Sequence, residues 1–353
     1  MKSFAINGSF LLQQTTGLQR YALELVCALD KLEIRDIKIE LIISKKTLNI
    51  PKLQNIKIVK YGNIKKINLW EQTYFAFYCI MKNATPINLC NMTQLLKPCG
   101  ISAILDISFK VNPQFFDYFF GFFSKPWHKI NYWFICKFSK KIVTISEFSK
   151  NEIIKYYKVK TEKISIVPCA WQHIIQKSYQ SLNPENLGSG SYFFAMSSIV
   201  RNKNFKWILE VAKRNLNFQF KIAGFFDSKK FSEYFNFKEL TNVEFLGYIN
   251  DEQAKILIQN ARAFLFPSFY EGFGLPPLEA LALGTPIIIS NIPVLREVYG
   301  GSAYYIDPYD YDVDLEQLLA KEIEPAEKVL NKFSWENSAG KLKEILQNYG
   351  SNK

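Results

Sequence analysis

The stretch PSFYEGFGLPPLEALALGTPIIISN, residues 267–291, decides the fold. The short apolar run Ala263–Phe266 comes directly before it and is typical of a buried strand. A loop with two glycines follows, and two consecutive prolines then open a predicted helix over Leu278–Leu283. Proline favours the first helical positions, and glycine favours the position after the last. The stretch therefore predicts a strand, a glycine loop, a helix and a second buried strand over Ile287–Ile289.

The glycine loop and the helix start make a site suited to an anionic ligand. The free N–H groups of a helix N-terminus attract anions, and Gly272 and Gly274 let the backbone approach a ligand closely. Glu271 in the loop and Glu279 in the first turn of the predicted helix would flank the same pocket. Their carboxylates can accept hydrogen bonds from sugar hydroxyls. The pattern suits a nucleotide sugar, and the alternative is an ordinary strand-to-helix turn with two solvated glutamates.

The stretch resembles the signature of a known enzyme family. Its residues E-G-F-G-L-P-x-x-E-A, followed by G-T-P and S-N, are similar to the Glu-x7-Glu signature of retaining glycosyltransferases of family four. The resemblance implies the GT-B architecture, an α/β fold with two Rossmann-like domains whose parallel sheets face each other across a cleft. It further implies a hexosyltransferase of a bacterial surface-polysaccharide cluster, such as one for lipopolysaccharide O-antigen or capsule. Such an enzyme moves a sugar from a nucleotide-sugar donor to a saccharide acceptor, here expected to be lipid-linked, with retention of anomeric configuration.

The length of 353 residues predicts two domains, each large enough for its own core. We place an N-terminal, acceptor-side Rossmann-like domain at 1–170 and a nucleotide-sugar-binding Rossmann-like domain at 171–334. The second domain is expected to begin with a linker over 171–190 and to contain helices over Phe205 to about Arg214, 229–238 and 251–259. A C-terminal helix over about 335–349 is expected to return to the first domain, as the family resemblance implies. The start of the chain lacks a signal-peptide layout and no long uncharged apolar run is present, so we expect a cytoplasmic protein.

The net charge of +12 is unevenly distributed. Residues 1–170 contain 25 lysines and arginines against 11 aspartates and glutamates, whereas residues 171–353 are close to neutral. The difference indicates that the two halves meet different partners. An anionic membrane surface or a phosphate-bearing acceptor fits the basic half, which suggests peripheral contact with the inner face of the cytoplasmic membrane. Nucleic acid is another candidate for a basic half, but no nucleic-acid-binding motif is present and we expect no such partner.

The segment Pro113–Phe138 contains twelve aromatic residues among 26, interrupted by charged residues such as Asp117 and Lys129. It is too charged to span a bilayer. Two interpretations stay open: an aromatic-rich helical hairpin packed on the sheet, or partial contact with the lipid interface, which suits aromatic side chains beside lysines.

Metal and redox cofactors are not indicated. The six cysteines form no C-x-x-C pair and the chain has only two histidines, so we expect neither a zinc site nor a structural disulfide. The turn after the first predicted strand lacks G-x-G-x-x-G, which argues against a dinucleotide cofactor. We therefore expect a metal-independent enzyme with no cofactor, for which the nucleotide sugar is a substrate.

The family resemblance assigns donor binding to a set of residues in both halves of the chain. The set comprises Gly17, Arg201, Lys203, Gly247, Tyr248, Glu271, Gly272, Phe273, Gly274, Leu275 and Glu279. By this resemblance Glu279 accepts hydrogen bonds from the ribose hydroxyls, and Glu271 contacts the transferred sugar. Transfer without a metal needs cationic side chains for the departing diphosphate, and Arg201 and Lys203 fit that role.

The predicted catalytic residues are Glu271, Asp106, Arg201 and Lys203. Asp106 ends a predicted strand over Ile101–Asp106, at the strand end where α/β sheets place their ligands. The family usually has His-Asp at this point, whereas this chain has Leu105 before the aspartate. The family mechanism is often described as same-face attack without a side-chain nucleophile, in which the leaving phosphate takes the acceptor proton.

Two other functions are compatible with the same motif. A GT-B nucleotide-sugar epimerase would convert the donor with no acceptor present. A non-catalytic nucleotide-sugar or membrane-binding GT-B protein would bind without turnover, and Leu105 is the feature that favours it.

Overall fold

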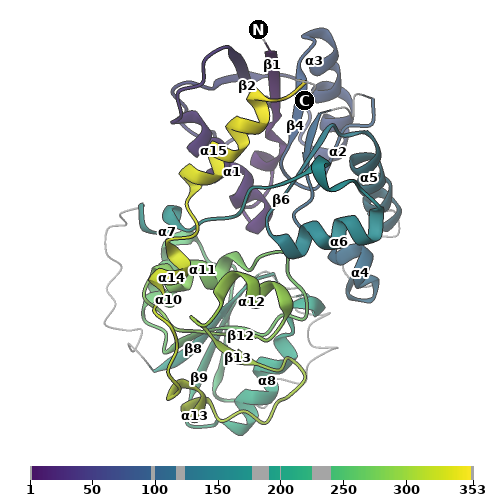
Figure 1. Ribbon diagram of the computed structural model, residues 1–353. Coiled ribbons are helices and arrows are strands. Elements are labelled where there is room, and N and C mark those ends of the chain that lie inside the picture. The colour runs from purple at the N-terminus through teal and green to yellow at the C-terminus, as the bar shows by residue number, and fades with distance from the viewer. Residues whose placement is uncertain are drawn as a thin grey trace. The chain divides into compact units, whose positions relative to one another are not determined.

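The computed structural model describes residues 2–96, 100–116, 124–176, 191–198, 200–224 and 240–350 (Figure 1). The chain divides into two compact units. The first comprises Met1–Val111, Phe120–Cys169 and Trp335–Lys353, and the second comprises Asn112–Phe119 and Ala170–Ser334. The predicted helix over 229–238 and most of the predicted linker over 171–190 lie outside the described residues.

The first unit is built on a seven-stranded parallel sheet with the order β3-β2-β1-β4-β5-β6-β7. Ile6 on the inner strand β1 is paired with Leu41 on one side and Ile87 on the other, and all three side chains are fully buried. Strands buried on both faces require such apolar runs. The strands are β1 (Lys2–Asn7), β2 (Ile37–Ile43), β3 (Lys57–Lys60), β4 (Thr85–Asn88), β5 (Ile101–Ala103), β6 (Lys141–Thr144) and β7 (Ile164–Ile166).

Helices cover both faces of this sheet (Figure 1). The helix after the first strand packs beside the last helix of the chain, where the rings of Tyr21 and Trp335 lie 6.1 Å apart. The helical segments are η1 (Gly8–Leu12), α1 (Gly17–Asp30), α2 (Ile67–Trp70), the π-helical η2 (Glu71–Phe75), α3 (Ala76–Met81), α4 (Ser108–Val111), α5 (Ser124–Phe138), α6 (Glu147–Tyr157), η4 (Thr161–Lys163) and α15 (Trp335–Gln347).

The second unit has a six-stranded parallel sheet with the order β10-β9-β8-β11-β12-β13. Its strands are β8 (Tyr192–Met196), β9 (Gln219–Ala223), β10 (Val243–Gly247), β11 (Ala263–Phe266), β12 (Ile287–Ser290) and β13 (Tyr304–Ile306). Its helical segments are η3 (Pro113–Phe116), α7 (Gln172–Gln176), η6 (Arg201–Lys203), α8 (Phe205–Arg214), α10 (Asp251–Gln259), α11 (Leu275–Ala282), α12 (Pro293–Tyr299), α13 (Leu315–Leu319) and α14 (Glu327–Leu330).

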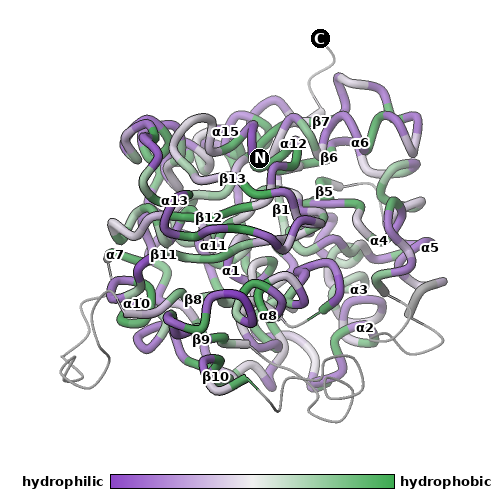
Figure 2. The backbone as a smooth tube through the Cα atoms, turned by 90° about the horizontal axis from the view of Figure 1, so that it is seen from below, coloured by the Kyte–Doolittle hydropathy of each residue, from purple (hydrophilic) through white to green (hydrophobic). Residues whose placement is uncertain are grey.

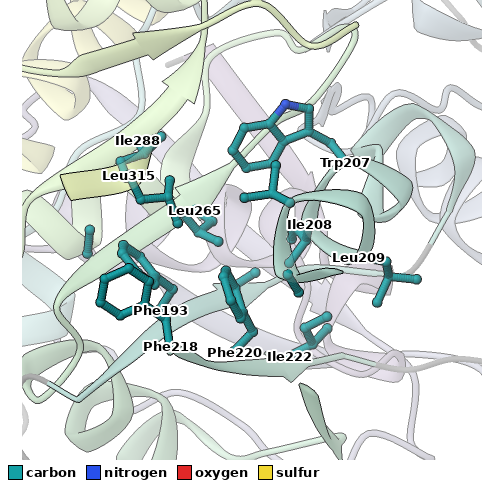
Figure 3. Packing of buried hydrophobic residues seen from close by; sticks show 14 of the residues in the cluster. Phe193, Trp207, Ile208, Leu209, Phe218, Phe220, Ile222, Leu265, Ile288 and Leu315 are labelled. Atoms are coloured by element: carbon teal, nitrogen blue, oxygen red, sulfur yellow. The ribbon is translucent and has the colours of Figure 1, made fainter. Parts of the chain in front are cut away.

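The core of the second unit lies between α8 and the sheet (Figure 3). Trp207 and Ile208 from α8 pack with Phe193, Phe220 and other buried side chains of the neighbouring strands. The indole N–H of Trp207 donates to the carbonyl of Asp310 over 2.6 Å, so its polar atom is satisfied. Figure 2 shows the same distribution along the chain, with hydrophobic stretches in the strands and hydrophilic residues in many connections.

Several boundaries differ from the sequence-based expectations. The predicted linker begins with the helix α7, whose residues belong to the second unit. Helix α11 begins at Leu275 rather than after the prolines, because Gly274 with φ +90° is its N-cap and proline is tolerated in the first turn. Glu279 is therefore the fifth residue of the helix and does not lie in its first turn.

The aromatic segment is also divided differently from the predicted hairpin. Its first part, η3, is grouped with the second unit, and Phe115 stacks on Phe269 at 5.6 Å between ring centroids. Its last part is α5 in the first unit, where Ile130 and Trp133 are exposed. Residues 117–123 lie outside the described residues.

A buried polar network lies at the carboxyl ends of β1 and β4 in the first unit and includes one residue of η2. Oε1 of Glu71 accepts hydrogen bonds from Asn7 Nδ2 at 3.0 Å and Ser9 Oγ at 2.6 Å. Asn7 Nδ2 also donates to Asn88 Oδ1 at 3.1 Å. Oε2 of Glu71 is buried without a hydrogen-bond partner in the described structure. Burial raises the pKa of Glu71, because the charged carboxylate loses its hydration while Ser9 and Asn7 compensate only in part.

The raised pKa predicts a pH-dependent stability that Glu71→Gln removes. A carboxyl with a raised pKa in the folded state stabilises the fold fully below its unfolded pKa of about 4.3, and this contribution is lost as pH rises through the folded pKa. The melting temperature of Glu71→Gln relative to the native protein should therefore rise as the pH increases above the unfolded pKa of about 4.3. Calorimetry at a series of pH values measures this difference, and parallel curves for the two proteins would contradict the prediction.

Glu40→Gln is a control of opposite sign. Burial works to raise the pKa of Glu40, but hydrogen bonds from Lys38 and Tyr78 and the charge of Lys38 outweigh it, so the pKa is lowered. The stabilisation by Glu40 is present above the unfolded pKa and is lost as pH falls through the folded one. Glu40→Gln should therefore be less stable than the native protein at neutral pH, and the difference should shrink on acidification.

Candidate functional site

The cationic turn η6 of the second unit is held directly against the loop after β11. Nζ of Lys203 lies 2.6 Å from Oε1 of Glu271, and both side chains are largely buried. The same ammonium lies over the ring of Phe266 at 5.2 Å. The amide of Phe269 donates to the carbonyl of Asn202 at 2.9 Å, which fixes the two loops together through the backbone. Two of the predicted catalytic residues, Lys203 and Glu271, are thus in contact.

The turn ends in a strained residue that the sequence analysis did not single out. Asn204 has φ +53°, and its side chain donates to the carbonyl of Pro308 at 2.8 Å. Asparagine tolerates the left-handed region better than most residues, which allows α8 to start directly after the cationic turn. Arg201, the first residue of this turn, is exposed.

The glycine loop brings its predicted donor-binding residues into one compact turn. Gly274 has φ +90°, and a Cβ at this position would lie 2.8 Å from Cδ2 of Leu295. The hydroxyl of Tyr299 donates to the carbonyl of Gly274. Phe273 and Leu275 on either side are buried, as is Gly272. Position 274 therefore requires glycine, because its backbone is left-handed and Leu295 leaves no space for a Cβ.

Glu279 has a partner that the sequence analysis missed. Nε2 of His173, on α7, lies 2.8 Å from Oε1 of Glu279, and both residues are more than nine-tenths buried. His173 is one of only two histidines in the sequence. The available signal was its position shortly after the predicted end of the first domain, but 106 residues separate it from Glu279. No pattern of local spacing could link the two.

Gly247 and Tyr248 lie at the end of β10. Gly247 has φ +67° and its carbonyl accepts a hydrogen bond from the amide of Gly224 at 2.7 Å, so this turn is fixed to the end of β9. The side chain of Tyr248 is 57% exposed, which leaves its ring accessible. Their assignment to the nucleobase stays a prediction.

The remaining predicted residues, Gly17 and Asp106, belong to the first unit. Gly17 is the exposed first residue of α1, behind a capping box formed by Thr16 and Gln19. Asp106 accepts a hydrogen bond from the amide of Ser108 at 2.8 Å at the start of α4, three residues beyond the end of β5. Leu105 is buried, and its amide donates to Asn91 Oδ1 at 2.7 Å. The catalytic role of Asp106 stays a prediction.

No metal-binding group of three or more His, Cys, Asp or Glu side chains occurs among the described residues. No helix in the described part of the chain is long and apolar enough to cross a membrane.

Comparison with known proteins places the site in a family. Residues 183–348, which contain the cationic turn, the glycine loop and Glu279, match the family model described as glycosyl transferases group 1. These residues belong to that family. The expected recognition is thereby confirmed for this part of the chain, and the two parallel sheets confirm the predicted α/β fold class.

Two curated relatives are similar in sequence to about half of this chain. The chain is 28% identical over 221 residues to O-antigen chain mannosyltransferase B of Escherichia coli, covering 56% of this chain and 58% of the relative. It is 33% identical over 195 residues to O-antigen chain mannosyltransferase RfbU of Salmonella typhimurium, covering 52% of each. The chain thus spans about half the length of the curated relatives it matches.

Sucrose-phosphate synthase from Thermosynechococcus elongatus has a similar structure, with a TM-score of 0.71, 16% identity and 99% of both chains covered. At this identity the likeness shows the fold alone, and that fold is GT-B, as the family resemblance implied. The predicted cleft between the two domains stays a prediction.

Gly274→Ala tests the requirement for glycine in the loop, and Gly284→Ala is its matched control. Both glycines have a positive φ, +90° and +81°, but a Cβ at Gly284 meets nothing within 4 Å. Backbone strain alone should cost Gly284→Ala about 1–2 kcal/mol of unfolding free energy. Gly274→Ala should lose about 1–3 kcal/mol more, because Leu295 must move. Urea denaturation measures both, and equal losses would mean that the close approach to Leu295 is unimportant.

Proposed function

We propose that this protein is a retaining glycosyltransferase that moves a sugar from a nucleotide-sugar donor to a saccharide acceptor in the synthesis of a surface polysaccharide such as O-antigen. The observation that carries the proposal is the arrangement in the second unit. The Lys203–Glu271 pair, the left-handed turn at Gly274 and the buried Glu279 lie in one family-matched domain. Such a domain offers a cation for a diphosphate and carboxylates for hydroxyls.

The proposed transfer breaks the bond between the anomeric carbon and the phosphate oxygen and forms one to an acceptor hydroxyl on the same face. The negative charge that develops on the leaving diphosphate is stabilised by Lys203 and Arg201, so that we expect no metal to be required. The leaving phosphate oxygen takes the proton of the acceptor hydroxyl. Glu271 both positions Lys203 and contacts the transferred sugar, while Glu279 binds the ribose and Asp106 acts on the acceptor side.

Mannose is the first donor sugar to test. The relatives at 28% and 33% identity are named O-antigen mannosyltransferases, and serotype-specific mannosyltransferase WbdA of Escherichia coli is 36% identical over 105 residues. The proposed acceptor is an oligosaccharide, lipid-linked in the cell. We propose that the enzyme works in the cytoplasm, at the inner face of the membrane that carries this lipid.

A donor panel with Lys203→Ala tests the proposal. Isothermal titration with GDP, UDP, ADP and their hexose conjugates, with EDTA present, should reveal one nucleotide that binds the native protein. Lys203→Ala should weaken this binding at least about tenfold, because removing a charge-assisted hydrogen bond costs about 1.5–3 kcal/mol. Lys206→Ala is the matched control, since Lys206 lies on the adjacent helix α8 and contacts Tyr311 instead of the glycine loop. It should bind as the native protein does.

Absence of nucleotide binding across the panel would overturn the proposal. Incubation of the bound sugar nucleotide with and without an oligosaccharide acceptor then separates the alternatives. Conversion of the donor sugar without an acceptor would identify an epimerase, and binding without any transfer would identify a non-catalytic protein.

We also propose that the first unit contacts an anionic membrane. The outer side of its α2–α3 helical segment and its α5 carry large exposed apolar side chains, namely Leu69, Phe77, Ile80, Met81, Ile130 and Trp133. Exposed lysines accompany them at Lys66, Lys82, Lys129 and Lys137, and the ammonium of Lys137 lies over the ring of Trp133 at 4.5 Å. Aromatic and aliphatic side chains beside lysines suit the interface of an anionic bilayer.

Phe77→Ser combined with Trp133→Ser tests this surface. The native protein should co-sediment with vesicles that contain phosphatidylglycerol but much less with pure phosphatidylcholine, and salt should weaken the binding. The double variant should lose most of the binding, because both exposed apolar anchors are removed. Leu216→Ser is the matched control, because Leu216 is 69% exposed in the second unit and should not contribute. Equal binding by all three proteins would exclude this surface.

A further inference from the structure

The short helix α7 is fixed at its start by two side-chain hydrogen bonds to one segment of the second unit. The indole N–H of Trp171 donates to the carbonyl of Leu330 at 3.0 Å. The side-chain amide of Gln172 donates to the carbonyl of Phe333, also at 3.0 Å. The next residue is His173, so the imidazole projects from a backbone that is held at two consecutive positions.

The same segment is attached to the glycine loop. The ring of Phe333 meets the ring of Phe273 edge to face, with 5.1 Å between centroids. Phe273 directly precedes Gly274, the N-cap of α11, which carries Glu279. Helix α7 is therefore connected to α11 in two ways. One is indirect, through Phe333 and the glycine loop, and the other is the direct contact between His173 and Glu279.

The direct contact between α7 and α11 is a histidine–carboxylate hydrogen bond. Nε2 of His173 lies 2.8 Å from Oε1 of Glu279. A carboxylate can only accept hydrogen bonds, and an imidazole with a hydrogen on Nε2 is the donor that this geometry suits. The exposed fractions of the two residues are 5% and 7%, so neither side chain can adopt another rotamer freely.

We propose that His173 is a positioning residue for donor binding: it holds Oε1 of Glu279 and thereby directs the second oxygen, Oε2, to the ribose hydroxyls of the nucleotide. The proposal rests on the proposed function and adds to it a residue outside the Glu-x7-Glu stretch and outside the matched residues 183–348. Glutamate has three rotatable side-chain bonds, and a carboxylate that is oriented before the donor arrives loses less conformational freedom on binding.

The partners of the two signature glutamates differ in a way that fits two roles. Glu271 is paired with the ammonium of Lys203, a group that can also attract a diphosphate. Glu279 is paired at 2.8 Å with a ring nitrogen of an imidazole instead of an ammonium, and this contact fixes one of its two oxygens. The histidine therefore suits a carboxylate whose task is to accept hydrogen bonds from neutral hydroxyls.

Binding of a ribonucleotide and of its dideoxy form to the native protein and to three variants tests the proposal. The probes are GDP and UDP and their 2′,3′-dideoxy forms, which lack the ribose hydroxyls. Titration of the native protein selects the nucleotide that binds. His173→Ala should then weaken binding of the ribonucleotide about tenfold or more, whereas it should leave binding of the dideoxy form within about twofold. Glu279→Gln should show the same selectivity for the ribonucleotide, and the double variant should lose no more than the larger single loss.

Two further variants separate positioning from folding. His173→Gln, which keeps a side-chain N–H donor, should recover a part of the ribonucleotide affinity. His128→Gln changes the other histidine of the chain, on α5 of the first unit, and should leave both affinities unchanged. Equal weakening of the ribo- and dideoxy-nucleotides by His173→Ala would show a merely structural role and overturn the inference, while the proposed function would stand. Failure of the native protein to bind any nucleotide would instead overturn the proposed function.

Discussion

The left-handed conformation at Gly274 is the constraint on which the candidate site depends. The chain leaves β11 and must enter α11 within nine residues, from Pro267 to Leu275, and the positive φ at Gly274 makes the final turn. Tyr299 from α12 holds the carbonyl of this residue, and Leu295 from the same helix fills the space that a side chain would need. The direction of α11, and with it the position of Glu279, follows from this turn. On the other side of the loop, Glu271 is placed where Lys203 can reach it.

Most of the fold follows from local patterns in the sequence. The strands of both sheets are short apolar runs, and helices such as α8 and α10 coincide with the expected Phe205–Arg214 and 251–259. Helix α11 begins three residues before the predicted Leu278, because glycine at the N-cap and proline in the first turn are both compatible with a helix start at Leu275. Helix α7 lies within the predicted linker, because its five residues are too few for a helical periodicity to be recognised in the sequence.

The candidate site was predictable only in part, because sequence patterns record neighbours along the chain. Glu271, Gly274 and Glu279 stand in one stretch, and their spacing indicated a ligand site. The partners Lys203 and His173 are 68 and 106 residues away from the glutamates that they contact. Lys203 was found through a family resemblance, while His173 had no such support. The buried Glu71 was likewise hidden, because its partners Asn7 and Ser9 come from a strand end more than sixty residues earlier.

The discontinuous first unit has a consequence for how the chain folds during synthesis. Tyr21 of α1 lies against Trp335 of α15, and Phe4 of β1 lies 5.5 Å from Tyr349, two residues after the end of α15. These contacts join the earliest part of the chain to its last segment, Trp335–Lys353, so the first unit is incomplete while the ribosome is still translating the second. The contiguous residues Ala170–Ser334 can pack their own core before α15 emerges. The half that is translated first is thus completed last, and its apolar α1 face needs protection until then.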